Sequence, residues 1–174
     1  MSLSIYQASV PVFVRTLTNL KNILAKGAAH AQAKKIDEEG FMQARLAPDM
    51  FPFTSQVHIA TDMARAGAAR LTGNDPPKYE DTEKTIDELK ARVAKTVAYL
   101  KSLDKAKIDA AADREITFPL GPVNKGAMKG DDYLTHFVLP NFYFHLTATY
   151  AILRHAGVEV GKRDFLGQIP LKMT

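Results

Sequence analysis

The stretch DDYLTHFVLPNFYFHLTATYAILRH, residues 131–155, decides the fold. Six of its side chains recur at alternating spacings of four and three residues, which is the periodicity of one face of an α-helix. This face consists of Leu134, Val138, Asn141, His145, Ala148 and Ile152. The stretch therefore predicts a long helix that packs against other helices and carries two polar side chains on its buried face.

Pro140 lies inside this predicted helix, directly before the two polar positions. Proline has no backbone N–H, and its ring clashes with the preceding turn. We therefore expect the helix to kink or restart at Pro140, which frees a backbone carbonyl about four residues upstream.

Three other segments show helical periodicity, at residues 6–24, about 51–71 and about 82–103. The third contains Thr85 and Glu88 at the spacing of a capping box. The second carries small residues on its apolar face, which either let a neighbouring backbone come close or leave room for a ligand. These small residues are Ala60, Ala64 and Gly67.

Residues 114–130 have a different pattern, with alternating apolar side chains followed by a Gly121-Pro122 break, and they predict a small β-hairpin. The elements together predict an all-α protein, a four-helix bundle with this hairpin between its third and fourth helices. One domain over residues 1–174 accommodates them. The connection between the first and second helices is long enough to allow a crossover.

Composition excludes several classes of protein. The chain has 174 residues and no cysteine, so it contains no disulfide, no cysteine-ligated metal and no thiol nucleophile. The net charge is +4, but the excess of basic residues is confined to the first 36, without the dense basic stripe that nucleic-acid binding requires. No apolar run reaches the length of a membrane span and no secretory signal is evident, so we expect a soluble, cytoplasmic protein.

Asn141 and His145 are four residues apart, which places their side chains next to each other on the helix. Inward-facing polar side chains build the metal and substrate sites of four-helix bundles. A buried histidine is equally explained as a core residue that a neighbouring amide satisfies by hydrogen bonding. The spacing alone leaves both interpretations open.

The second helix offers His58 and Asp62, also four residues apart and able to reach one metal ion. Their phase places them beside the apolar face, where they indicate a charged outer surface. Gln56 is the alternative inward-facing polar residue on this helix. A rotation of the helix by one residue would bring His58 inward.

Several motifs resemble a bacterial family of unknown function that is grouped with the DinB/YfiT-like bundles. The motifs are LPNFYFH at 139–145, YAILR at 150–154, GKRDFLG at 161–167 and LAPDMFP at 46–52. The resemblance covers essentially the whole chain and implies a four-helix bundle with a crossover, often dimeric. Better understood members of that group hold a divalent metal on the bundle axis, through one histidine of the second helix and an HxxxH pair of the fourth.

The resemblance places the HxxxH pair on Asn141 and His145, and the second-helix ligand near Gln56 or His58. The sequence thus departs from the metal pattern, because side-chain amides are poor ligands for transition metals beside imidazole.

Two hypotheses follow, and they leave open whether the chain is an enzyme. In the first, it is a dimeric small-ligand-binding or structural protein with a degenerate metal site and no tightly held metal. Its polar pocket is lined by Gln56, Asn141 and His145, with Tyr143 or Tyr6. In the second, it is a DinB-like divalent-metal-dependent enzyme of the thiol transferase or hydrolase type. Zn²⁺ or Ni²⁺ is then held by His58 and His145 with Asp62 or Asn141.

Overall fold

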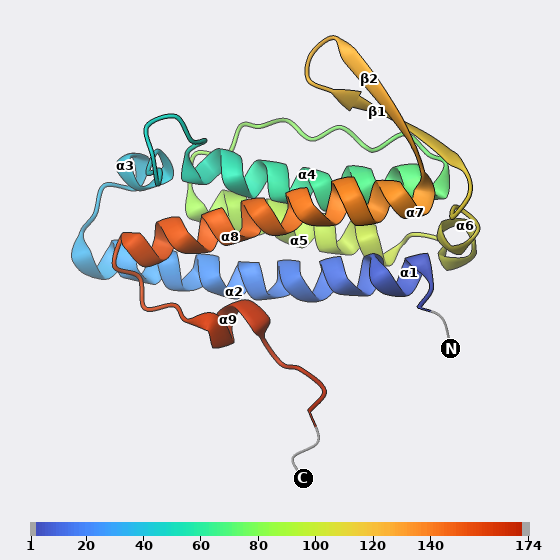
Figure 1. Ribbon diagram of the computed structural model, residues 1–174. Coiled ribbons are helices and arrows are strands. Elements are labelled where there is room, and N and C mark those ends of the chain that lie inside the picture. Colours follow the sequence, from blue (N-terminus) through green and yellow to red (C-terminus); the bar gives the residue numbers. More distant parts are fainter. Residues whose placement is uncertain (1–2, 172–174) are drawn as a thin grey trace.

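The computed structural model describes residues 3–171 and is built mainly from helices (Figure 1). None of the helices in this part of the chain is long and apolar enough to cross a membrane. The elements are, in chain order, α1 (Ile5–Ala8), α2 (Val10–Lys34), α3 (Glu38–Met42), α4 (Phe53–Thr72), α5 (Ile86–Lys101), α6 (Lys105–Asp109), β1 (Glu115–Leu120), β2 (Asn124–Lys129), α7 (Gly130–Asp132), the π-helix η1 (Tyr133–Val138), α8 (Leu139–His155) and α9 (Lys162–Leu166).

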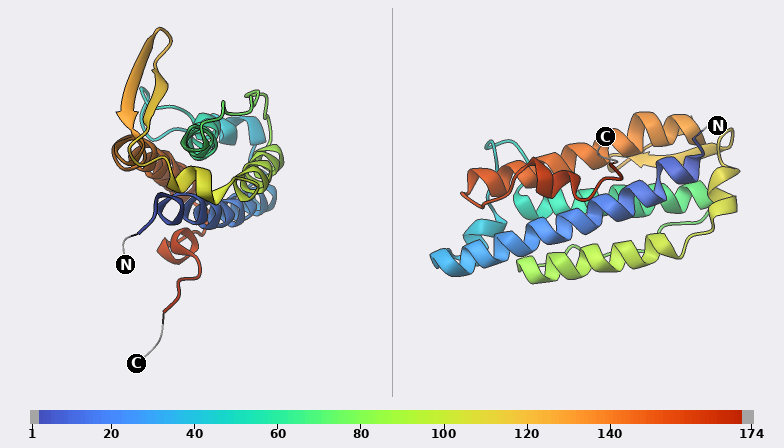
Figure 2. Two further views of the ribbon diagram at one scale, coloured as in Figure 1. Left: turned by 90° about the vertical axis from the view of Figure 1, so that its right-hand side faces the viewer. Right: turned by 90° about the horizontal axis from the view of Figure 1, so that it is seen from below.

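The four long helices α2, α4, α5 and α8 form the predicted bundle. The predicted capping box is present, since Thr85 caps α5 together with Glu88. The strands β1 and β2 pair in antiparallel register from Glu115 opposite Lys129 to Leu120 opposite Asn124. This hairpin projects from one end of the bundle (Figure 2). The fold class predicted from the sequence is confirmed.

The crossover lies between α4 and α5. These two helices run in the same direction and pack against each other, so residues 73–85 return along the length of the bundle (Figure 1). Gly73 ends α4 with a left-handed φ of 85°, and the prolines at 76 and 77 prevent the helix from continuing through this segment. The connection between α2 and α4, which the sequence made a candidate for the crossover, instead turns back at one end through α3.

The buried face of the fourth helix agrees with the predicted one at five of its six positions, which are Leu134, Val138, His145, Ala148 and Ile152. A π-helix precedes α8. The N–H of Leu139 donates to the carbonyl of Leu134, five residues back, at the turn where Pro140 has no N–H to offer. Phe142 and Leu146 of α8, which the predicted face did not include, are also buried in the core. Asn141 was predicted to face the core, and it is only half-buried.

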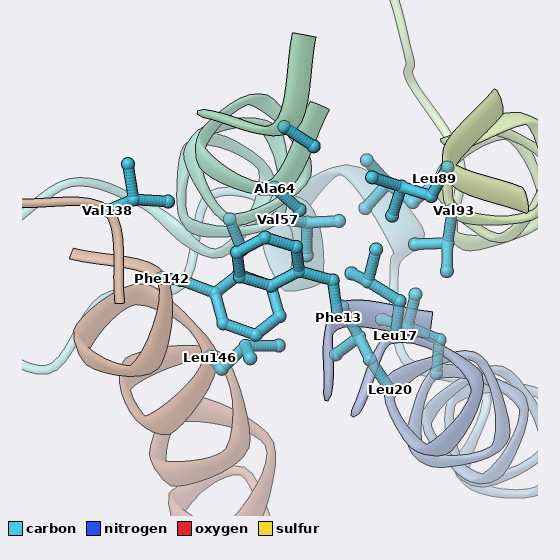
Figure 3. Close-up of a cluster of buried hydrophobic side chains, with 14 of the residues drawn as sticks. Phe13, Leu17, Leu20, Val57, Ala64, Leu89, Val93, Val138, Phe142 and Leu146 are labelled. Atoms are coloured by element: carbon cyan, nitrogen blue, oxygen red, sulfur yellow. The ribbon is translucent and has the colours of Figure 1, made fainter. Parts of the chain in front are cut away.

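Side chains from all four helices meet in one hydrophobic core (Figure 3). Phe13 of α2 and Phe142 of α8 pack edge to face, with ring centroids 4.9 Å apart. Val57 of α4 and Leu89 of α5 belong to the same cluster and are fully buried. The core therefore fixes which side of α4 faces the bundle axis.

The small residues of α4 allow close packing, which resolves one of the alternatives left open by the sequence. Ala60 and Ala64 are fully buried in the core. A Cβ atom added at Gly67 would lie 2.6 Å from Cγ1 of Val138, so η1 and α4 approach too closely for any larger residue.

Gly67→Ala should lower the free energy of unfolding by about 1 to 3 kcal/mol in urea denaturation, because the new methyl group overpacks the contact with Val138. Combining it with Val138→Ala should remove this penalty. Gly40→Ala is the matched control, since the atom nearest to its added Cβ would be Oδ2 of Asp37, at an ordinary contact distance of 3.6 Å. A Gly67→Ala protein at least as stable as the wild type would contradict the close contact.

Candidate functional site

Gln56 of α4 and His145 of α8 form a buried hydrogen bond between the two helices. Nδ1 of His145 lies 2.7 Å from Oε1 of Gln56, and the Gln56 amide nitrogen donates to the carbonyl of Phe51 at 3.0 Å. Gln56 is 1% exposed and His145 is 8% exposed. The pair therefore joins α4, α8 and the segment that leads into α4.

This arrangement fixes the chemistry of the imidazole. The amide nitrogen of Gln56 is held by Phe51, so its oxygen faces Nδ1 of His145, which must carry the proton and donate. Burial lowers the pKa of His145 below its ordinary value of 6.5, so the ring is neutral at physiological pH. Nε2 is left with a lone pair that can accept a hydrogen bond or bind a metal ion.

The structure separates the other residues predicted for this pocket. The Asn141 amide donates to the carbonyl of Phe137, one turn back on its own helix, at 2.7 Å. Tyr143 is 37% exposed on the outer side of α8. Tyr6 lies on α1, at the opposite end of the bundle from the start of α4 (Figure 1).

An apolar groove of about 430 Å³ runs along the outer side of α8, and its lining includes chain neighbours of the Gln56–His145 pair but neither residue of the pair itself. Phe144 lines it, and the Phe144 ring packs edge to face on the imidazole of His145 with centroids 5.1 Å apart. Met50 also lines the groove, and it directly precedes Phe51, whose carbonyl holds Gln56. The full lining comprises Leu46, Met50, Pro140, Tyr143, Phe144, Thr147, Ala148 and Ala151.

A second polar cluster lies on the other side of α4, beneath the crossover. His58 is buried there, with Nε2 at 2.9 Å from Oε2 of Glu83 and Nδ1 at 3.6 Å from Oδ1 of Asp81. The sequence placed His58 and Asp62 on a charged outer surface. His58 is instead covered, because the returning chain lies over this face of α4.

Arg92 of α5 is the cation at the centre of this cluster. Its guanidinium is almost completely buried and pairs with Asp62 at 2.9 Å, Asp81 at 3.0 Å and Glu83 at 3.2 Å. Arg65 pairs with Asp62 at 2.7 Å and donates to the carbonyl of Pro77. These contacts hold the crossover against α4 and α5.

Tyr79, also in the crossover, adds cation–π contacts to this attachment. The guanidinium carbon of Arg65 lies 4.4 Å from the centre of its ring, and Nζ of Lys95 lies 4.2 Å from it. The crossover is therefore attached to both helices by charged side chains.

The position where the family resemblance implies a metal does not fit one. Oε1 of Gln56 is engaged by His145, and the Asn141 amide is engaged by its own helix. His145 alone offers a free nitrogen there, whereas catalytic zinc sites use three protein ligands. The structure also does not bring His58, Asp62 and His145 together. Within residues 3–171, the group of three whose ligand atoms lie within 4.8 Å of one another is His58, Asp81 and Glu83.

Sequence reasoning missed Asp81, Glu83 and Arg92. Arg92 occupies a position in the predicted third helix, but its charge gave no reason to expect burial. Asp81 precedes the predicted third helix and Glu83 lies in its first turn, so nothing in the local pattern placed either acid against α4. The acidic run after the double proline, residues 80–83, was the one available signal.

Comparison with known proteins agrees with this architecture. The family described as Domain of unknown function (DUF1993) matches residues 5–166. A crystal structure of a DinB family member protein from Shewanella denitrificans is 40% identical, with a TM-score of 0.88, covering 97% of this chain and 95% of that chain. No match is found among curated proteins.

Long-range ¹H–¹⁵N NMR should find His145 as the Nδ1–H tautomer, titrating below 6.5 because burial disfavours the charged ring. The unfolded chain then binds this proton more tightly than the native protein does. His145 therefore does not lower the free energy of unfolding above pH 6.5. It lowers this free energy as the pH falls through the pKa that the residue has in the native protein.

The matched variant is His145→Gln, which has no titrating group at this position. As the pH drops from about 7.5 to 5, the wild type should lose more unfolding free energy than His145→Gln does. An Nε2–H tautomer, or a pKa above 6.5, would refute the assigned hydrogen bond.

Proposed function

The chain belongs to the DUF1993 family, and we propose that it is a small-ligand-binding protein whose ligand lies in the apolar groove beside the Gln56–His145 pair. The observation that carries the proposal is the hydrogen bond from His145 to Gln56. This bond occupies Oε1 of Gln56 and Nδ1 of His145, which lie at the position where DinB-like relatives hold a metal. Nε2 of the neutral imidazole remains as a hydrogen-bond acceptor.

The geometry supports recognition more than metal-dependent chemistry at this position. A neutral imidazole held by a buried amide is preorganised, so little entropy is lost when a ligand binds. No acidic side chain contacts His145 in the part of the chain that the structure describes, and its pKa is lowered by burial alone. Such a ring favours an uncharged hydrogen-bond donor over a cation.

The groove defines the remaining chemistry of the ligand. Its walls are almost entirely apolar, with Thr147 and Tyr143 supplying hydroxyl groups. Its volume of about 430 Å³ lies in the range of small-molecule sites. We therefore infer a ligand with an apolar body and one polar group that donates a hydrogen bond.

The same face supports a homodimer. Phe51 and Phe144 are 59% and 57% exposed on it, and Leu46 is 42% exposed. Large apolar side chains gathered in this way are typical of surfaces that another protein covers. A second copy of the chain on this face would close the groove over a bound ligand.

The probe 8-anilinonaphthalene-1-sulfonate tests the groove, since it combines aromatic rings with an N–H donor. We expect saturable fluorescence enhancement by the wild type. Ala151→Glu should weaken the affinity at least about tenfold, because it puts a charge that repels the sulfonate on the groove wall. Val123→Glu is the control, because Val123 is an apolar residue, 85% exposed, that lies outside the groove. Equal effects of the two substitutions would refute a ligand site in the groove.

Light scattering across a concentration series tests the homodimer. The wild type should have twice the mass of the 19.2 kDa chain. Phe144→Glu should shift it to the monomer, because it places a charge in the apolar contact, whereas Val123→Glu should not. A monomeric wild type at every concentration would rule the dimer out.

A further inference from the structure

We propose that His58, Asp81 and Glu83 form a binding site for a first-row divalent cation such as Zn²⁺, which fastens the crossover to α4. The site lies on the side of α4 that the crossover covers and uses none of the groove residues. It is therefore independent of the small-ligand function proposed above.

Three ligand groups of suitable chemistry converge at this place. One atom from each of the three residues lies within 4.8 Å of the other two. One imidazole nitrogen and two carboxylate oxygens are donors that Zn²⁺ accepts at separations of about 2.0 to 2.2 Å from the ion. Two donors that share one ion at that distance are at most about 4.4 Å apart, so the observed spacing lies within a few tenths of an ångström of what one ion requires.

The geometry at His58 supplies an independent observation. Its side chain is more than nine-tenths buried, and Nε2 has no aligned hydrogen-bond partner among the described residues. Oε2 of Glu83 nevertheless approaches this nitrogen to 2.9 Å. A nitrogen and an oxygen that are close together but out of line for a hydrogen bond have the relation of two ligands to one ion.

The charges around the site leave room for a cation. Asp62, Asp81 and Glu83 carry three negative charges, and they face the two positive charges of Arg65 and Arg92. With His58 neutral, the cluster has one excess negative charge.

Arg92 contacts both carboxylates and holds them in place. Its Nη1 donates to Oε1 of Glu83 at 3.2 Å and to Oε2 at 3.4 Å, and its Nη2 pairs with Oδ1 of Asp81 at 3.0 Å. Hydrogen-bonded groups behind the ligands commonly orient them in metal sites. Asp81 is 57% exposed, so the ion has a path from solvent and a coordination position open to water.

The test is equilibrium dialysis of chelator-treated full-length protein against Zn²⁺, followed by elemental analysis. We expect about one bound ion per chain and, at a hundredfold excess over Kd, a rise in Tm of about 5 to 10 °C. Mg²⁺ should produce neither effect at the same concentration, because it prefers a site made only of oxygen ligands.

Asp81→Asn and Glu83→Gln should each abolish the bound ion and the Tm rise. Because the side chain of Asp81 is exposed, we expect Asp81→Asn to fold as the wild type does. His145→Gln and His136→Gln are the matched histidine controls and should retain both effects. Absence of Zn²⁺ binding by the wild type, retention in Asp81→Asn, or loss in His145→Gln would overturn the proposal.

Discussion

The parallel orientation of α4 and α5 is the constraint on which the rest of the structure depends. Two adjacent helices that run in the same direction need a connection as long as the bundle, and residues 73–85 provide it. A chain segment without regular structure must be held down by its side chains. Arg92, Arg65 and His58 do this by contacting acids and carbonyl groups of the crossover. A buried arginine in this protein is thus a consequence of topology.

The crossover gives α4 two chemically different sides. Gln56 and His58 are two residues apart, which on an α-helix separates their directions by about 200°. Gln56 therefore meets His145 of α8, while His58 meets the carboxylates of the returning chain. The position on the bundle axis therefore lacks the ligands of a metal site, whereas one imidazole and two carboxylates lie together under the crossover. The two proposals made for this protein rest on these two sides of one helix.

The sequence was informative where structure is local. Periodicity predicted the four helices, alternation predicted the hairpin, and Thr85 with Glu88 predicted the start of α5. The π-helix before α8 could not be predicted, because the effect of Pro140 depends on how the freed backbone groups are satisfied. The place of the crossover could not be predicted either, because both connections are long and the entropy of closing a loop changes slowly with its length. Gln56 and His145 were predicted to line one polar pocket, and the structure joins them by a hydrogen bond although they lie 89 positions apart in the chain.

The central claim is that the metal chemistry of this chain lies under the crossover and not on the bundle axis. Anomalous diffraction at the zinc absorption edge, from crystals of the protein grown with Zn²⁺, tests it most directly. The account predicts a peak between His58, Asp81 and Glu83, and an undisturbed hydrogen bond between Gln56 and His145. A peak bound to Nε2 of His145, with none at His58, would contradict it.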